Sequence, residues 1–330
     1  MYKPIQIAEI LYHHRVNKDI ELSKLEDYRT ESKKWRDSMS LILLHRVCTS
    51  SARFQDNLFE ENAIPPEILV TLGNENIQSN GAVEAYVYKR FFEKHNQLSY
   101  ALEYCMLATR DSFNVKEFIN LFWKEAGLKR SLDKVYEIIV YSLFSTLVEV
   151  LSLKVEISVA EDALPLLKEF EDFSTKIMCL DADNTTYIQD ARVYRVGVTN
   201  AADRGLDMYS NWGPAIQIKH LTLSEDLAEG IVTGVSSDRI VIVCKDAEKK
   251  VICSLLTQIG WRSKIQSIVT EEDLIQWYEK ALRGTYAKLL ADKLLETLSD
   301  EISLEFPSVD AVPDVLTERN YENITNVFWK

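Results

Sequence analysis

The sequence predicts an α+β (mixed α/β) protein, in which a mainly helical region precedes a core with a central mixed β-sheet flanked by helices. Residues 1–152 repeat apolar side chains mostly at helical spacing. From residue 153 onward, short segments rich in β-branched residues alternate with helical patterns. Apolar residues make up 46% and charged residues 27% of the 330 residues, which are values of a globular protein. We therefore expect a helical region over 1–152, a core over 153–300 and a C-terminal extension over 301–330.

Apolar repeats predict several helices in the first half. The first repeat places four apolar side chains near one helical face, namely Ile5, Ile7, Ile10 and Leu11. The stretch 48–81 is rich in small and polar residues, so we expect a loop, a short helix and a further turn there. Helices are predicted over 2–16, 25–47, 82–108, 114–128 and 131–151, with Asn114 and Ser131 as N-caps of the last two.

The second half carries strand signals between helical ones. Residues 206–223 read as a hairpin whose turn is the SNWG sequence at 210–213. The apolar run DRIVIVC at 238–244 is typical of a central strand buried on both faces. Further strands are predicted over 153–159 and 191–199, and helices over 162–173, 224–234 (with Ser224 as its cap), 248–260 and 271–302.

Cysteine usage and hydropathy bound the class of protein. No run of about 18 apolar residues is present, so we expect no membrane span. The first residues lack the pattern of a signal peptide. Five scattered cysteines without a CxxC pair argue against a zinc cluster or a disulfide framework. A reducing cytoplasm is the expected location.

The charge distribution separates the two halves. The net charge is −13, and residues 1–155 hold 20 basic and 21 acidic residues, so most of the negative charge lies beyond residue 155. This distribution argues against a protein that coats nucleic acid non-specifically. It is compatible with a metal-dependent phosphodiesterase, in which a cation and local basic residues meet the phosphate.

One constellation in the predicted hairpin suits phosphodiester hydrolysis. Strand alternation puts Gln217 and Lys219 on one face and leaves Ile216 and Ile218 for the other. A turn at 210–213 would pair Asp207 roughly opposite Gln217. The carboxylate of Asp207, the amide oxygen of Gln217 and the backbone carbonyl of Ile218 are hard oxygen ligands suited to Mg²⁺. The Lys219 ammonium would face the phosphate and orient or deprotonate the attacking water.

The same string also fits a solvated surface hairpin, but a family resemblance favours the nuclease interpretation. The D-x9-QIK spacing resembles the PD-(D/E)xK nuclease core, in the subtype with glutamine in place of the second acid. The glycine-bearing approach formed by Asp203, Gly205 and Asp207 is similar to that of the Mrr-like branch. Three segments, YKPIQIAEILYHHR, TSSARFQDNLFEENAIPP and NAADRGLDM…GPAIQIKH, more closely resemble the HaeII-type restriction endonucleases over most of the chain.

The resemblance implies a role for each core residue. Asp207 would be the metal ligand, Gln217 a metal-proximal amide and Lys219 the catalytic ammonium. The residue before Asp207 is Leu206, where the signature is named for a proline. Because Gln217 brings no negative charge, another carboxylate is expected to complete the metal shell. The upstream candidates, among which the sequence does not choose, are Glu137, Glu149, Glu169 and Glu171.

A sequence-specific nuclease also needs surfaces that reach DNA. The stretch 45–57 concentrates polar side chains at a predicted loop-to-helix junction, where hydroxyls and helix N-termini contact phosphates well. An ordinary polar loop with a capped helix explains the same stretch, and a plain strand-end histidine explains His220. The expected DNA contacts are Arg46, Ser50, Ser51, Arg53, Gln55, Asn57, Arg204 and His220.

The resemblance implies a Mg²⁺-dependent type II restriction endonuclease that cuts double-stranded DNA at a short, GC-rich palindrome. Such enzymes usually act as homodimers, since protein two-fold symmetry matches that of the site. The helical region over 1–152 would then serve recognition and dimerisation. A cognate DNA methyltransferase would protect the host DNA without a stable complex. The alternatives are a structure-selective or methylation-dependent nuclease of the same superfamily, or a non-catalytic DNA-binding protein on a nuclease fold.

Overall fold

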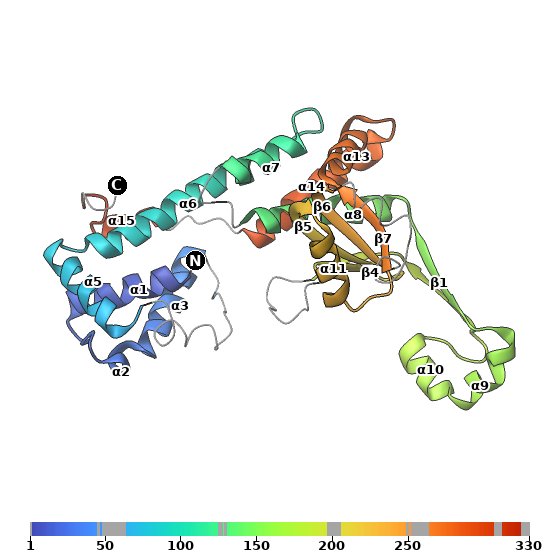
Figure 1. Cartoon of the computed structure of the whole chain (residues 1–330), viewed down its shortest axis with the longest axis horizontal. Coiled ribbons are helices and arrows are strands. Elements are labelled where there is room, and N and C mark those ends of the chain that lie inside the picture. The colour runs from blue at the N-terminus through green and yellow to red at the C-terminus, as the bar shows by residue number, and fades with distance from the viewer. Residues whose placement is uncertain are drawn as a thin grey trace. The chain divides into compact units, whose positions relative to one another are not determined.

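The computed structural model describes residues 2–44, 47, 64–124, 128, 131–196, 206–248, 251, 264–306 and 312–324. Within them the chain forms helices, a two-stranded sheet and a five-stranded sheet of mixed direction, which confirms the predicted α+β class (Figure 1). The chain divides into two compact units. Unit 1 comprises 1–103 and 303–330, and unit 2 comprises 104–302. The division of roles between 1–152 and 153–300 stays a prediction.

Unit 1 is a helical assembly around two apolar clusters. The four residues predicted to share a face of the first helix are all buried; Ile5 belongs to one cluster and the other three to the second. The helix α1 packs against α3 and α5. The helices are α1 (Tyr2–Tyr12), the π-helix η1 (His13–Asn17), α2 (Leu25–Tyr28), α3 (Glu31–Leu44), α5 (Pro66–Gln78), most of α6 (Ala82–Met106) and α15 (Val312–Glu318).

A buried ion pair fastens the C-terminal segment to the first helix. Two nitrogens of Arg319 donate to the two carboxylate oxygens of Glu9, at 2.6 and 3.1 Å. The guanidinium also lies 3.9 Å from the centre of the Tyr12 ring. A two-point arginine–carboxylate contact fixes orientation as well as distance. Residues 310 positions apart in sequence are thereby held in one core.

Unit 2 is organised around the five-stranded sheet, whose strands follow the order β3-β4-β5-β6-β7. β4 is antiparallel to both of its neighbours, β3 and β5, whereas β5, β6 and β7 run parallel. The helix α11 (Glu225–Gly234) connects the parallel pair β5 and β6, and the Ser224 side chain caps it by accepting from the Leu227 amide. The strands are β3 (Val193–Arg195), β4 (Met208–Ser210), β5 (Ala215–Leu223), β6 (Ile240–Ala247) and β7 (Ile265–Thr270).

Helices pack on this sheet and hold it by hydrogen bonds. The helix α8 (Leu132–Val150) contacts β3 and β5, and α13 (Glu271–Arg283) contacts β6 and β7. The Tyr136 hydroxyl of α8 donates to the Cys244 carbonyl of β6 at 3.1 Å. The Tyr278 hydroxyl of α13 donates to the Ile139 carbonyl of α8 at 2.8 Å. The remaining helices of the unit are α7 (Val115–Lys124), which contacts α8 and α13, and most of α14 (Ala287–Glu305).

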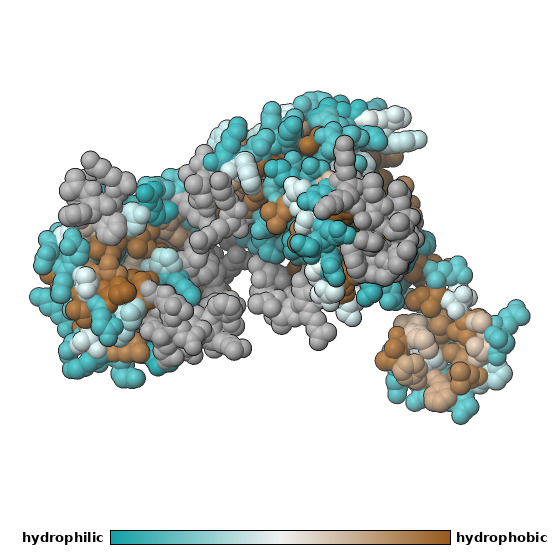
Figure 2. Space-filling model, viewed as in Figure 1, coloured by the Kyte–Doolittle hydropathy of each residue, from teal (hydrophilic) through white to brown (hydrophobic). Residues whose placement is uncertain are grey.

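Residues 154–190 form a separate small lobe, which we call the ribbon lobe. Its strands β1 (Lys154–Ser158) and β2 (Thr186–Asp190) pair antiparallel and carry three short helices between them. Its buried residues are few, namely Leu167, Ser174 and Leu180. The helices are η3 (Glu161–Ala163), α9 (Leu164–Glu169) and α10 (Glu171–Met178). Apolar surface is visible over α9 and α10 in Figure 2.

Most predicted elements are present, with several differences in detail. The hairpin with its turn at 211–213, the central strand β6 and the caps Asn114 and Ser224 are confirmed. The predicted helix over 25–47 is interrupted between α2 and α3, and the Ser131 side chain makes no capping bond. The strands β2 and β7 were not predicted. Most of the predicted helix over 248–260 lies outside the described residues.

Two findings bear on the expectations about membranes and cysteines, and both concern the described residues only. No helix in this part of the chain is long and apolar enough to cross a bilayer. The cysteines that the structure describes, Cys105, Cys179 and Cys244, are unpaired thiols.

The hydroxyl of Tyr278 provides a test of how α13 is held on α8. The substitution Tyr278→Phe removes a buried hydrogen bond to the Ile139 carbonyl, which keeps its helical donor within α8, and is expected to lower the free energy of unfolding by about 0.5–1.5 kcal/mol. Urea unfolding followed by circular dichroism measures the change. The matched control Tyr286→Phe changes a ring that is 68% exposed and is expected to leave the midpoint unchanged. Equal midpoints for both variants would contradict this role of the Tyr278 hydroxyl.

Candidate functional site

A tight hairpin brings the predicted acid and amide opposite each other. The register pairs Met208 with Ile216 and Tyr209 with Ala215, so Asp207 is directly opposite Gln217. At the turn, Gly213 has a φ of +121°, which favours glycine. A Cβ at this position would also collide with the guanidinium of Arg239, which donates to the Trp212 carbonyl at 2.6 Å. The chain therefore needs glycine here to keep this register.

Three groups of β5 converge on one carboxylate oxygen. The backbone N–H of Ile218 donates to Asp207 Oδ2 at 2.7 Å, and the Gln217 amide nitrogen donates to the same oxygen. The ammonium of Lys219 lies 3.6 Å from it. The opposite face of β5 is apolar and buried, as predicted, since Ile216 and Ile218 are each 4% exposed. The trio that the sequence singled out is thus brought together: Gln217 and Lys219 lie on β5, in the interior of the sheet, and Asp207 directly precedes the neighbouring strand β4.

Burial dominates the electrostatics of Asp207. Desolvation raises the pKa of its carboxyl above the ordinary value of 3.8. The hydrogen bond from the Ile218 amide and the charges of Lys219 and Lys134 act in the opposite direction and do not cancel the effect of burial. The carboxylate is therefore short of positive charge, which a bound cation would supply.

Of the four upstream glutamates, Glu137 is electrostatically coupled to Asp207. It is 6% exposed on α8, and Lys134 donates to both of its carboxylate oxygens, at 3.0 and 2.7 Å. Burial raises the pKa of Glu137, the Lys134 contacts lower it, and the nearby charge of Asp207 raises it further. The side chain of Glu149 is 64% exposed and paired with Lys293. The remaining two, Glu169 and Glu171, belong to the ribbon lobe.

The donor set fits a hard divalent cation. The side chains of Asp207, Gln217 and Glu137 and the Ile218 carbonyl offer oxygen ligands, the type preferred by Mg²⁺. Magnesium retains water and is often held by only one or two carboxylates. Correspondingly, no group of three or more His, Cys, Asp or Glu gathers as a metal cage in the described part of the chain.

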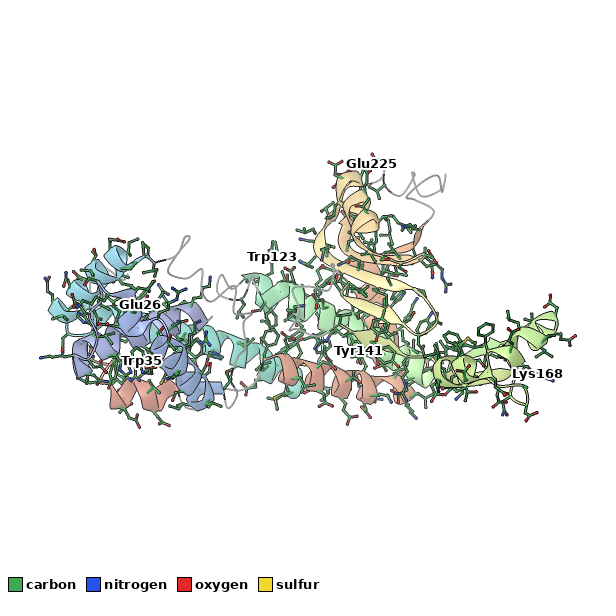
Figure 3. All side chains as sticks on the ribbon, turned by 90° about the horizontal axis from the view of Figure 1, so that it is seen from below. Glu26, Trp35, Trp123, Tyr141, Lys168 and Glu225 are labelled. Carbon is green, nitrogen blue, oxygen red and sulfur yellow. The ribbon has the colours of Figure 1, made fainter. Side chains whose placement is uncertain are left out.

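His220 lies in the interior and not on the surface expected for a phosphate contact. Its side chain is 3% exposed, and Nε2 is 2.8 Å from a carboxylate oxygen of Glu271 at the start of α13. The rings of Tyr136 and Trp123 pack on it at centroid distances of 4.7 and 5.8 Å. Trp123 is labelled on α7 in Figure 3. A buried imidazole that is paired with Glu271 does not reach a phosphate, so His220 is not proposed as a DNA contact.

The other expected DNA contacts lie outside the described residues. These are Arg204 and the six residues Arg46, Ser50, Ser51, Arg53, Gln55 and Asn57. The Mrr-like approach residues Asp203 and Gly205 also lie outside them. Their contacts with DNA stay predictions.

Two basic residues near the site were not singled out from the sequence. Lys134 is three positions before Glu137 on α8, a spacing that places both on one helical face and is visible in the sequence. Arg195 on β3 binds Glu301 of α14 at 2.8 Å and lowers the pKa of Glu137. No sequence pattern connects Arg195 to the site, because the contact depends on how α8 packs on β3.

Comparisons with known proteins agree on one family. The family model described as HaeII restriction endonuclease matches residues 1–321. The chain is 58% identical to the type II restriction enzyme HaeII of Haemophilus aegyptius over 329 residues, which covers 99% of this chain and 94% of that protein. It is 56% identical to the type II restriction enzyme NgoBI of Neisseria gonorrhoeae over 316 residues, 96% of this chain and 89% of the relative. No solved structure matches it.

The raised pKa of Asp207 predicts a stabilising substitution in the metal-free protein. A carboxyl whose pKa is higher in the folded state contributes stability below the unfolded value of 3.8, and this contribution is lost as the pH rises through the folded pKa. At pH 7 the ionised Asp207 therefore destabilises the fold. We expect Asp207→Asn to raise the free energy of unfolding by about 0.5–2 kcal/mol in EDTA at pH 7.

Urea unfolding at pH 7 and at pH 4 measures this difference. The advantage of Asp207→Asn should shrink at the lower pH, where the wild-type carboxyl is increasingly protonated. The exposed control Asp226→Asn is expected to change neither midpoint. A less stable Asp207→Asn at pH 7 would mean that the hydrogen bonds to the carboxylate outweigh its burial.

Proposed function

The chain belongs to the HaeII restriction endonuclease family, and from this premise we propose that Asp207, Gln217 and Lys219 form a Mg²⁺-dependent site of the PD-(D/E)xK type. The enzyme is a type II restriction endonuclease, a hydrolase of phosphodiester bonds in double-stranded DNA. Its target is proposed to be a short, GC-rich palindrome.

The observation that carries this assignment is the convergence on Asp207 Oδ2. An amide, a backbone N–H and an ammonium meet one largely buried carboxylate, whose side chain is 13% exposed, and the opposite face of the hairpin is apolar and closed. A purely structural ion pair would gain little from burying an acid whose pKa burial raises. Such perturbed groups concentrate at functional sites.

In the proposed site, Asp207 and the Ile218 carbonyl hold the cation. The Gln217 amide would turn its oxygen to the cation, which exchanges its bond to Asp207 for a ligand contact. Glu137 is the proposed second acid, because it is the buried one of the four upstream glutamates and the charge of Asp207 raises its pKa. Mg²⁺ held there would neutralise phosphate charge and would lower the pKa of the attacking water.

Lys219 has a separate task in the proposed mechanism. Its side chain is 38% exposed, in contrast to the buried Gln217, so its ammonium is accessible to a phosphate. There it stabilises the charge that develops on the phosphate oxygens and orients the water that attacks phosphorus. An ammonium is suited to this role because it is a compact charge with three donors that can turn toward the phosphate oxygens.

DNA is proposed to be read by the segment 45–57 together with Arg204, whose residue types suit phosphate and base-edge contacts. A methyltransferase that modifies the same site would protect the host DNA without a stable complex with this chain. The cytoplasm is the proposed location, since both the DNA and the free thiols belong there.

We propose a homodimer because the described part of the chain holds one carboxylate–amide–ammonium set, whereas a palindrome presents two strands to cut. The ribbon lobe offers a surface for the contact. Four apolar side chains on α9, on α10 and at the junction between them are 51–69% exposed: Leu166, Phe170, Phe173 and Ile177. They offer on the order of 400 Å² per chain, about half of a ~800 Å² half-interface.

The charge of the ribbon lobe argues against DNA as its partner. It contains three lysines and nine carboxylates, a net charge of −6. A surface of this sign repels phosphates. An isolated two-stranded ribbon is also marginally stable in water, so a partner that covers it would stabilise the lobe.

Digestion of unmethylated phage DNA with Mg²⁺ tests the function, and end-sequencing of the fragments gives the site. Discrete fragments are expected. We expect Asp207→Ala and Lys219→Ala each to lower the cleavage rate by about 10²-fold or more, because each removes a group that stabilises the transition state. Their affinity for DNA in EDTA, without a divalent cation, should stay within a few fold of that of the parent.

The matched controls Asp226→Ala and Lys280→Ala change exposed residues on α11 and α13 and should cut at the parent rate. Near-normal cleavage by Asp207→Ala or Lys219→Ala would show that the site is elsewhere. Cleavage that requires methylated or branched DNA would favour a methylation-dependent or structure-selective nuclease. If the parent chain bound DNA without cutting it, a non-catalytic DNA-binding protein would be favoured.

The dimer surface is tested by the double substitution Phe173→Glu and Ile177→Glu, which puts two charges among the four exposed apolar side chains of the ribbon lobe. Light scattering after size exclusion is expected to find a dimer for the parent chain and a monomer for this variant at micromolar concentration. The control Lys168→Glu changes an exposed residue of α9 and should stay dimeric. A dimeric double variant would place the interface elsewhere, and a parent chain that is monomeric even with cognate DNA would contradict the homodimer.

A further inference from the structure

Two tyrosines beside the site expose large areas of aromatic surface. Tyr194 on β3 is 38% exposed and Tyr209 on β4 is 44% exposed. Their rings stack at a centroid distance of 5.1 Å and an interplanar angle of 20°. The pair thus presents a broad, flat aromatic surface to solvent, although aromatic side chains gain free energy from burial.

Both rings lie on the face of the hairpin that carries Asp207. Tyr209 pairs with Tyr194 in the register, and Tyr209 is two residues after Asp207, so the three side chains point to the same side of the strands. The β3–β4 ladder extends as far as Asp207, whose carbonyl accepts from the Val196 amide at 2.9 Å. The opposite face is closed: Val193, Met208 and Ser210 are each at most 5% exposed.

The spacing of the pair from the site matches the spacing of nucleotides. Two residues along a strand span about 6.8 Å, and neighbouring strands are about 4.8 Å apart. Successive base pairs along DNA rise by about 3.4 Å. A phosphate held at Asp207 therefore places the rings within about one or two nucleotides of the bond that is cut.

The exposed rings suit a neutral part of DNA better than a phosphate. The face of an aromatic ring carries partial negative charge, which gives no attraction for an anion.

We propose that Tyr194 and Tyr209 form an aromatic platform that packs against the nucleoside next to the scissile phosphate. The proposal rests on the function assigned above, in which Asp207 holds the site of cleavage. Within a duplex the base faces are stacked on one another, so the ring faces meet the apolar side of the deoxyribose, or the face of a base that leaves the stack. Such contacts tolerate any base. The platform is thus a positioning element: it fixes the strand along the sheet so that the phosphate meets Asp207 and Lys219.

The experiment uses a fluorescent duplex that carries the cleavage site mapped from phage DNA. Binding is measured by anisotropy in Ca²⁺, and KM and kcat are measured in Mg²⁺. Tyr209→Ala is expected to weaken binding about 5- to 100-fold, the range for loss of one ring–base contact. Tyr209→Phe should bind as the parent chain does, because the ring face and not the hydroxyl makes the contact. The control Tyr286→Ala removes an exposed ring between α13 and α14 and should have no effect.

A second arm separates the contact from a merely structural role of the rings, since an exposed cross-strand pair also stabilises its hairpin. Duplexes that lack the base one or two nucleotides from the cut are compared with the intact duplex. If the ring packs on the base, the effect of Tyr209→Ala disappears on one of the abasic duplexes. If the ring packs on the deoxyribose, the effect persists on both. Urea unfolding checks that each variant is folded. If Tyr209→Ala is unstable, Tyr209→Val takes its place, because valine favours strands and also lacks the aromatic ring.

The platform is overturned if Tyr209→Ala binds and cuts the intact duplex within two-fold of the parent, or if Tyr209→Phe fails as Tyr209→Ala does. A failure of the proposed function is distinguishable, because Asp207→Ala would then still cut. That result would overturn the platform too, since no scissile phosphate would adjoin the rings.

Discussion

The site depends on a buried carboxylate that two strands hold beside an ammonium. Asp207 accepts the Ile218 amide across the hairpin, and this bond sets its distance from Gln217 and Lys219. The bond requires the 207-to-217 register, which in turn requires the turn at Gly213 and the buried isoleucines on the other face of β5. A shift of one residue would turn Gln217 and Lys219 into the apolar interior.

The protein maintains this carboxylate against an unfavourable environment. Burial raises the pKa of both Asp207 and Glu137, and the charges of Lys134, Lys219 and Arg195 only partly offset the effect. The stability comes from elsewhere in the unit, from the parallel strands β5, β6 and β7 and from two helices. The Tyr136 hydroxyl links α8 to β6, and the Tyr278 hydroxyl links α13 to α8. A site that is short of positive charge before it binds a cation is what metal-assisted hydrolysis needs, because the energy of cation binding is then available to hold DNA phosphate.

The sequence predicted the hairpin and the proximity of Asp207, Gln217 and Lys219 because their signals are local. The alternation around Gln217 and Lys219 and the turn sequence lie within a dozen residues, and family resemblance gave them a function. The strand β7 was missed because its run is short, and β2 because its alternating residues follow a polar turn. The choice of Glu137 over Glu149, the burial of His220 and the face shared by Tyr194 and Tyr209 depend on packing between distant segments, which periodicity does not encode.

The binding of the cation itself is the most direct test of the account. Calorimetric titration of the full chain with Mg²⁺ or Mn²⁺, in the presence of uncleavable duplex DNA, is expected to show uptake by the parent chain and none by Asp207→Asn. Glu137→Gln should bind at least about tenfold more weakly, as the loss of a coordinating charge predicts. Equal uptake by the parent chain and Asp207→Asn would contradict the account, because the cation would then be held by residues other than those gathered around this carboxylate.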